Sequence, residues 1–241
     1  MENTRLEYLG TGISALVSSD HGFGTDALLL ADFAAPKRRE KACDFGSGCG
    51  IIPLIWCRDG HEEKITAVEI QAAACRQVQA AIKLNALEDK LEIINADIRN
   101  LKDLLPVGGY DLVSMNPPYK AANTGIKSSG QARRIARHEL MCSIEDVANA
   151  AAGILKFGGR FCLCHRPERL CDVLVALRGA GLEPKRLRSV AQTAEKAPWL
   201  ILVEAKKGAK AGMIVEPHLF IKKDNGDYSD EMKAIYGDYA L

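Results

Sequence analysis

Four consecutive residues near the middle of the chain, Asn116, Pro117, Pro118 and Tyr119, suit chemistry on a nitrogen atom. They follow a short apolar segment, and the two prolines end a strand because neither offers a backbone N–H. The Asn116 side-chain oxygen and the Pro117 carbonyl can accept from the N–H groups of a planar amine or amide, whose delocalised lone pair otherwise makes it a poor nucleophile. The Tyr119 ring can stack on such a group. We therefore predict that Asn116, Pro117 and Tyr119 hold the reacting nitrogen.

A glycine-rich segment, DFGSGCG (44–50), lies between a predicted strand and the helix that IIPLIWC suggests. Glycines at such a position permit a tight turn and a close approach of the backbone to a ligand. Gly46, Gly48 and Gly50 have the spacing G-x-G-x-G rather than G-x-G-x-x-G, which disfavours a pyrophosphate cradle.

Three carboxylates stand at the ends of three successive predicted strands. Asp44 can meet an ammonium group, Glu69 can accept from two ribose hydroxyls, and Asp97 can bind the exocyclic amino group of adenine. A ligand that combines an amino acid, a ribose and an adenine is S-adenosylmethionine, which we therefore expect as the cofactor. The cofactor-binding residues predicted in this region are Asp44, Gly46, Gly48, Gly50, Glu69, Ile70, Asp97, Ile98 and Asn116.

The segments that position these residues alternate between strand and helix patterns. Seven strands are predicted at 41–45, 64–70, 91–97, 110–115, 160–164, 187–192 and 199–207. Apolar faces at helical spacing follow Gln71, Ser143 and Pro167, with Gly158 and Gly159 expected to stop the second of these helices. Strands interleaved with helices indicate an α/β fold with a doubly wound, mostly parallel sheet. No helix pattern separates the last two strands, so we expect antiparallel pairing at one edge.

Length and composition favour a single globular domain. The chain has 241 residues, of which 47% are hydrophobic and 26% are charged, as in soluble proteins. No apolar run approaches the roughly 18 residues that span a bilayer, and the N-terminus lacks a signal-peptide core. The eight cysteines include no C-x-x-C pair, which favours reduced thiols in the cytoplasm over disulfides or a metal site. We expect an N-terminal capping segment (1–40), a catalytic core (41–207) and a tail (208–241).

The motifs resemble those of the class I methyltransferases, because DFGSGCG is followed in order by VEI, NAD and NPPY. HGFGTDALLLADFA (21–34), ARHELMCSIEDV, HRPERL and EPHLFIKKDNGDYSDEM resemble the tRNA1(Val) adenine-N6 methyltransferase family, over nearly the whole chain. The resemblance implies a Rossmann-like fold, S-adenosylmethionine as cofactor, and methylation of the adenine just 3′ of the anticodon. It also implies that 21–34 closes over the cofactor, with Phe23, Thr25 and Asp26 near its methionine end. The residues themselves indicate a helix capped by Thr25 or Asp26.

Two other functions are compatible with these motifs. NPPY also resembles the glutamine-N5 methyltransferases of release factors, but those carry a helical domain before the glycine turn, and only 43 residues precede Asp44 here. An RNA-binding module with a remnant cofactor pocket is disfavoured because the acids and Asn116 are all present. His138 is better interpreted as a core or helix-start residue than as a catalytic base.

Basic side chains gather in two stretches, although the net charge is only +1. We predict that tRNA phosphates contact the segment after NPPY and the basic region around the end of the last predicted strand. The residues are Lys127, Arg133, Arg134, Arg137, Lys206, Lys207 and Lys210. A solvated charged surface is the other interpretation. We expect no metal and no membrane partner, and a monomer is favoured.

Overall fold

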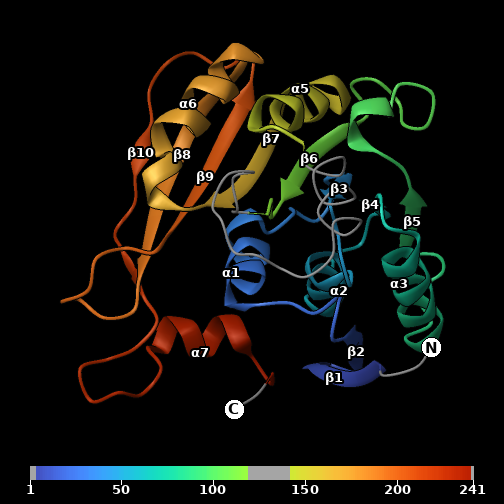
Figure 1. The fold of residues 1–241 in the computed structure, drawn as a ribbon, viewed down its shortest axis with the longest axis horizontal. Coiled ribbons are helices and arrows are strands. Elements are labelled where there is room, and N and C mark those ends of the chain that lie inside the picture. Colours follow the sequence, from blue (N-terminus) through green and yellow to red (C-terminus); the bar gives the residue numbers. More distant parts are fainter. Residues whose placement is uncertain (1–3, 119–141, 240–241) are drawn as a thin grey trace, which may run out of the picture.

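The computed structural model describes residues 4–118 and 142–239. Within these residues a nine-stranded sheet crosses the molecule (Figure 1). In spatial order its strands are β5 (Leu91–Asn95), β4 (Ile65–Glu69), β3 (Ala42–Phe45), β6 (Tyr110–Met115), β7 (Leu155–His165), β9 (Leu200–Lys207), β8 (Leu182–Ala191) and β10 (Ile214–Val215), while β11 (Leu219–Phe220) also pairs with β8. The central strands β3 and β4 are buried throughout, as parallel strands covered on both faces require.

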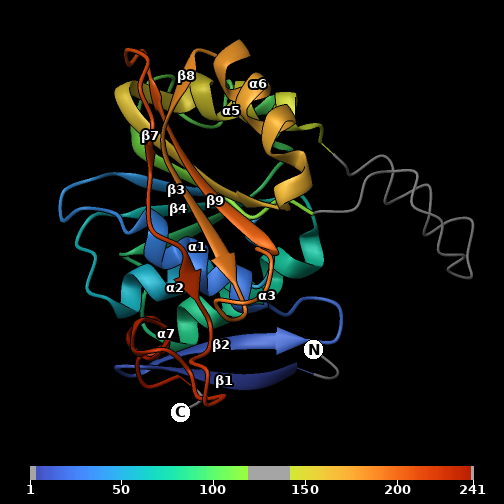
Figure 2. The same cartoon turned by 90° about the vertical axis from the view of Figure 1, so that its left-hand side faces the viewer.

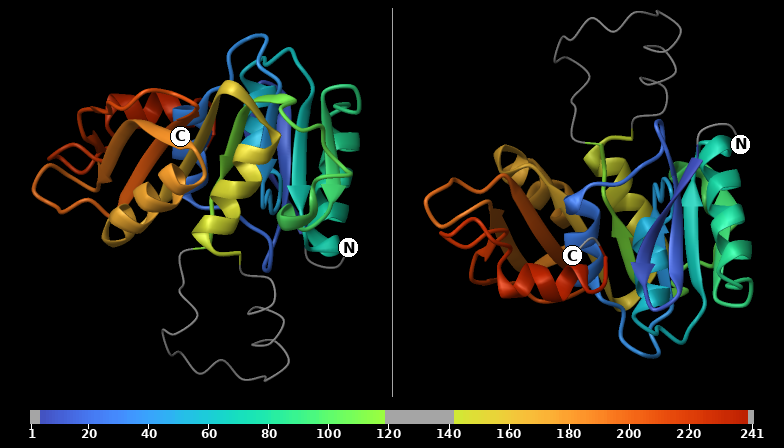
Figure 3. Two further views of the ribbon diagram at one scale, coloured as in Figure 1. Left: turned by 90° about the horizontal axis from the view of Figure 1, so that it is seen from above. Right: turned by 90° about the horizontal axis from the view of Figure 1, so that it is seen from below.

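Helices cover both faces of this sheet (Figures 1 and 3). One face carries α1 (Thr25–Ala34), α2 (Ile51–Arg58) and α3 (Ala72–Leu84), and the other carries α5 (Ile144–Ile154), α6 (Leu170–Gly179) and the short 3₁₀ helix η1 (Ile98–Asn100). A second 3₁₀ turn, η2 (Pro167–Arg169), leads into α6. No helix in the described part of the chain is both long and apolar enough to cross a bilayer. The doubly wound, mostly parallel arrangement predicted from the sequence is confirmed.

An N-terminal hairpin that the sequence patterns did not predict packs on α3 (Figure 2). Its strands are β1 (Thr4–Gly10) and β2 (Ile13–Ser18). The Asn85 side chain, just after α3, accepts from the Ser14 N–H and donates to the Ser14 carbonyl, both at 2.8 Å. Arg58 Nη1 donates to the carbonyls of Leu9 and Tyr236, both at 3.3 Å. The hairpin is thereby joined to the C-terminal helix α7 (Asp230–Tyr236).

Four local expectations meet different outcomes. The expected antiparallel hairpin is β8–β9; β9 is also antiparallel to β7, and β10 and β11 extend the sheet beyond β8. Ser143 caps α5 as predicted, in a reciprocal box with Asp146. However, α5 ends at Ile154 and β7 begins at the next residue, so Gly158 lies inside a strand instead of stopping the helix. The prediction that Thr25 or Asp26 caps α1 was wrong, because the N-cap is Gly24.

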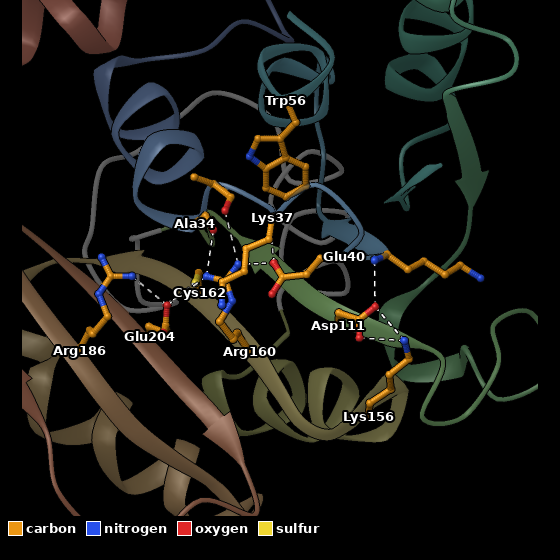
Figure 4. Close-up of polar contacts among 12 residues, drawn as sticks. Ala34, Lys37, Glu40, Trp56, Asp111, Lys156, Arg160, Cys162, Arg186 and Glu204 are labelled. Atoms are coloured by element: carbon orange, nitrogen blue, oxygen red, sulfur yellow. Dashed lines mark hydrogen bonds and ion pairs between the residues drawn. The ribbon is translucent and has the colours of Figure 1, made fainter. Parts of the chain in front are cut away.

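A buried arginine connects the end of α1 to the sheet (Figure 4). Arg160 on β7 donates through Nη1 to the Ala34 carbonyl (3.0 Å) and to Glu204 Oε2 (3.1 Å). Its Nη2 donates to Glu40 Oε2 at 2.5 Å, and Arg186 donates to the same Glu204 oxygen at 2.9 Å. A cation here satisfies a carbonyl that has no partner within the helix and also suits the negative end of the helix dipole.

We expect Arg160→Ala to lower the free energy of unfolding by about 3–5 kcal/mol, because removing one partner leaves buried carboxylates uncompensated. Urea denaturation followed by circular dichroism measures the change. Arg38→Ala is the matched control, since Arg38 pairs with Glu62 at the surface, and such a pair contributes about 0–1 kcal/mol. Equal losses in the two variants would contradict a special role for Arg160.

Candidate functional site

The predicted cofactor and acceptor residues gather at one edge of the sheet. Phe45 on β3 lies opposite Val68 on β4 and Met115 on β6 in the parallel register. The carboxyl ends of these three strands are therefore level with one another. The chain places β4 on one side of β3 and β6 on the other. Such a switch point opens a crevice at the carboxyl ends of the strands, where α/β proteins bind ligands.

Asp44 lies on β3 at this edge and is only 1% exposed. Its Oδ1 accepts from the Ser114 hydroxyl of β6 at 2.6 Å. Burial raises the pKa of the Asp44 carboxyl to about 7, although the Ser114 hydrogen bond opposes that shift by favouring the ionised form. A ligand ammonium group would favour the ionised form further. Ser114 was not predicted from the sequence, where its signal is a hydroxyl residue within an otherwise apolar strand.

Glu69 joins the glycine turn to the end of β4. Its Oε2 accepts from the Gly48 N–H at 2.9 Å, and its Oε1 accepts from the Gln71 N–H at 2.8 Å. All three predicted glycines have positive φ, which favours glycine. A Cβ added to Gly50 would lie 3.1 Å from Val78, whereas one added to Gly48 would meet no atom of the described residues within 4 Å. The backbone at Gly48 therefore borders open space that ligand atoms can fill.

Asp97 caps η1 beside the end of β4. The Ala96 N–H donates to the Glu69 carbonyl at 3.1 Å, which holds the two acids on neighbouring strands. The Asp97 carboxylate accepts from the Arg99 N–H at 2.9 Å and from the Arg99 guanidinium. The hydrogen bond from Arg99 keeps the pKa of Asp97 below its usual value, so an ionised acceptor stands at the third strand end. Ile98 is buried and Ile70 is half-buried.

The residues predicted to bind the acceptor nitrogen follow β6 directly. Asn116 is half-buried and Pro117 is buried, while Tyr119 lies outside the described residues. The Cys164 thiol, on the neighbouring strand β7, donates to Asn116 Oδ1 at 3.1 Å. A thiol is a weak donor, and this contact helps to orient the Asn116 amide. Cys164 was not predicted from the sequence, because nothing in its apolar strand distinguishes it from a core cysteine.

The predicted N-terminal motif contacts the C-terminal helix region. The Phe23 ring lies 5.6 Å from the Tyr239 ring, and Thr25 Oγ1 lies 3.4 Å from the Tyr236 hydroxyl. Asp26 Oδ1 accepts from the Ala27 N–H at 3.0 Å in the first turn of α1, where a carboxylate complements the helix dipole. Segments far apart in the sequence thus meet beside the start of α1.

The structure does not bring every predicted RNA-binding residue to this edge. Lys127, Arg133, Arg134, Arg137 and His138 lie outside the described residues. Lys206 on β9 lies opposite Arg160 on the antiparallel strand β7. Lys207 is the last residue of β9, which runs antiparallel to both of its neighbours. Lys210 accepts at its carbonyl from Lys185, near the start of β8. Because β9 runs in the opposite direction, Lys206, Lys207 and Lys210 lie towards the amino ends of the parallel strands, away from Asn116.

Comparison with known proteins supports methyl transfer. A family model described as the methyltransferase small domain matches residues 17–163. Curated relatives named tRNA1(Val) (adenine(37)-N6)-methyltransferase include one from Parabacteroides distasonis, 26% identical over 90% of this chain and 90% of that protein. Another, from Tolumonas auensis, is 28% identical over 90% of this chain and 89% of that protein. These relatives bear the name of the family that the sequence motifs resemble, so that prediction is confirmed.

Solved structures agree on the fold. A predicted O-methyltransferase from Agrobacterium tumefaciens has a TM-score of 0.69 and 19% identity, covering 88% of this chain and 95% of that chain. A SAM-dependent methyltransferase from Aquifex aeolicus has a TM-score of 0.54 and 15% identity, covering 76% and 89% respectively. The Rossmann-like fold predicted from the sequence is thereby confirmed. Since the family model spans more than half of the sequence and all of the predicted cofactor and NPPY motifs, the chain belongs to the methyltransferase small domain family.

Proposed function

We propose that the protein uses S-adenosylmethionine to methylate N6 of an adenine in tRNA, next to the anticodon. The proposal depends on one observation: Asn116 lies at the same edge of the sheet as Asp44 and Glu69. Its side-chain oxygen is a candidate acceptor for amino N–H groups. The name shared by the curated relatives supports adenine in tRNA as the substrate. We also propose that the protein acts in the cytoplasm, as a monomer.

The residues at the edge fit this cofactor. Asp44 is a buried carboxylate suited to the ammonium group, and Asp97 is an ionised acceptor for the adenine amino group. Glu69 is fixed by two backbone N–H groups, and the second lone pair of each oxygen is available to a ribose hydroxyl. The space beside Gly48 allows close approach of the ligand. When bound, S-adenosylmethionine supplies an electrophilic methyl group on a sulfonium.

The acceptor side relies on preorganised oxygen atoms. Asn116 Oδ1 and the Pro117 carbonyl would accept from the two N–H groups of the adenine amino group, which localises the nitrogen lone pair for in-line attack. Tyr119 would stack on the base. An adenine in the anticodon loop is unpaired, so turning it outward costs little free energy. Water can take the proton that N6 loses, and no side-chain base is needed.

We propose one domain for the whole chain, with 1–40 closing over the cofactor, 41–207 as catalytic core and 208–241 as a tail. The cations after NPPY would contact tRNA phosphates, whose charge dominates such affinity. These residues are Lys127, Arg133, Arg134 and Arg137.

The test of this function is the destination of a labelled methyl group. We expect the purified protein to label tRNA from a strain lacking the enzyme, and nucleoside mass spectrometry to identify N6-methyladenosine. Asn116→Ala should lower the rate on the order of 100-fold, because one preorganised acceptor is lost, with cofactor affinity nearly unchanged. Label in a release factor and none in RNA would instead support the glutamine-N5 alternative.

We expect Glu69→Ala to weaken cofactor binding about tenfold or more, because unpaired ribose hydroxyls at a buried site cost about 1–3 kcal/mol. Isothermal titration calorimetry measures the affinity. Glu88→Ala is the control, since Glu88 is an exposed acid beyond α3 and its loss should leave the affinity unchanged. A Glu69 variant that binds as tightly as the Glu88 variant would remove Glu69 from the site.

Cofactor affinity should depend on pH through Asp44. The ionised carboxylate binds the ammonium group, and the pKa of Asp44 is raised to about 7, so affinity should increase as the pH rises through that value. Below it, binding must also displace a proton, and affinity should fall by up to about tenfold per pH unit. In Asp44→Asn the cofactor affinity should vary with pH only through the titration of the cofactor's own groups. Identical pH profiles for the two proteins would contradict this role.

A further inference from the structure

The order of the strands determines what lies next to the acceptor residue. From β5 towards β8 the carboxyl edge presents in turn Asp97, Glu69, Asp44, Asn116, Arg166 and Trp199. The first three are the proposed cofactor-binding acids, and Asn116 is the proposed acceptor-binding residue. Because the proposed cofactor residues lie on β5, β4 and β3, the part of this edge formed by β7, β9 and β8 is left for the substrate beyond the acceptor nitrogen.

A cavity of about 370 Å³ lies on that side of the edge. Its walls come from the start of α1, the segments after β7, β8 and β11, the residue before β9, and α7. We call it the carboxyl-edge cavity, and its lining includes Thr25, Arg166, Gln192, Trp199, Lys222 and Tyr228. The volume falls within the range of small-molecule sites and suits a single nucleotide.

Two cations line the carboxyl-edge cavity. The Lys222 N–H donates to the Gln192 carbonyl at 2.9 Å, which holds the backbone in place. No hydrogen bond or ion pair of the Lys222 ammonium group occurs within 4–118 and 142–239, whereas Lys223 pairs with Asp230 at 2.6 Å. Arg166 is the second cation, and its Nη1 donates to the Trp199 carbonyl at 3.0 Å. Two cations in one small cavity match a phosphate group.

The other walls suit a base. The Arg166 guanidinium lies 5.6 Å from the centroid of the Trp199 ring, so an aromatic surface adjoins the cation. Trp199 Nε1 is buried and has no hydrogen-bond partner in the described part of the chain, and an indole N–H inside a protein usually has one. Asp26 also lines the cavity. Its carboxylate disfavours a ligand with several phosphates, whereas one nucleotide of a strand carries a single phosphate together with a polar base edge.

We propose that the carboxyl-edge cavity holds the nucleotide adjacent to the methylated adenine, with its phosphate on Arg166 and Lys222 and its base beside Trp199. The inference rests on the proposed action on RNA and deepens it. The strand would run from the acceptor position at Asn116, along the ends of β7 and β9, into the cavity. Recognition of a neighbouring nucleotide at this place would make methyl transfer depend on the sequence context of the adenine.

The test measures binding of an anticodon stem-loop RNA at several salt concentrations. We expect Lys222→Ala to weaken binding about tenfold, since a hydrogen-bonded charge pair is lost, and to reduce the salt slope by about one unit. Lys83→Ala removes the same charge from an exposed site on α3, at the opposite end of the sheet (Figure 3), and should change neither quantity. Both variants should bind the cofactor as the unmodified protein does, which verifies folding.

A neutral methylphosphonate at the linkage beside the target identifies the contacted phosphate. Lys222→Ala should not weaken binding of that RNA further, because the cation and the phosphate charge form one interaction. Trp199→Phe, which keeps a ring and loses the N–H, should lose affinity for the intact RNA and lose none when the neighbouring nucleotide is abasic. In one outcome, the unmodified protein methylates the stem-loop while Lys222→Ala binds it with unchanged affinity and salt slope. That result would overturn the cavity proposal and leave the proposed function standing. If the unmodified protein neither binds nor methylates RNA, the proposed function fails together with the cavity proposal.

Discussion

The buried guanidinium of Arg160 is the interaction on which the placement of α1 depends. Removing a cation from water is costly unless acceptors surround it, and here a carbonyl at the end of α1 and two carboxylates supply them. The other end of α1 reaches the carboxyl edge, where Thr25 lines the cavity. An ion network inside the molecule therefore anchors one end of the helix within the segment that we propose to close over the cofactor.

The carboxyl edge combines acids in different electrostatic states. Asp44 is buried with a raised pKa, whereas the neighbouring Arg99 lowers the pKa of Asp97. Glu69 has a third role, because its carboxylate holds the glycine turn through the Gly48 N–H. A ligand that carries positive charge on an ammonium and a sulfonium complements this arrangement, since a nearby cation favours the ionised form of a buried acid. The turn geometry and the electrostatics of the site thus depend on the same side chains.

The core of the fold, and the gathering of the proposed cofactor residues at one edge of the sheet, could be predicted because local sequence patterns determine both. Polar residues such as Glu69 and Asn116 end buried strands, and parallel strands deliver such ends to one edge. The β1–β2 hairpin could not be predicted in this way. In β1 the apolar residues Leu6 and Tyr8 alternate with Arg5 and Glu7, yet they are 59% and 53% exposed, so the alternation in this strand does not mark a buried face.

The positions of basic residues along the sequence do not indicate which of them lie near one another in the fold. Lys206 and Lys207 belong to a basic run, yet the reversed direction of β9 carries them away from the acceptor residues, and Lys207 donates to backbone carbonyls at the end of α5. Arg166 and Lys222, far apart in sequence, meet in one cavity. We propose that the phosphates of the substrate contact the cations that the topology gathers beside the proposed acceptor residue. Strand order and direction, which charge patterns do not contain, therefore decide which cations can contact the substrate.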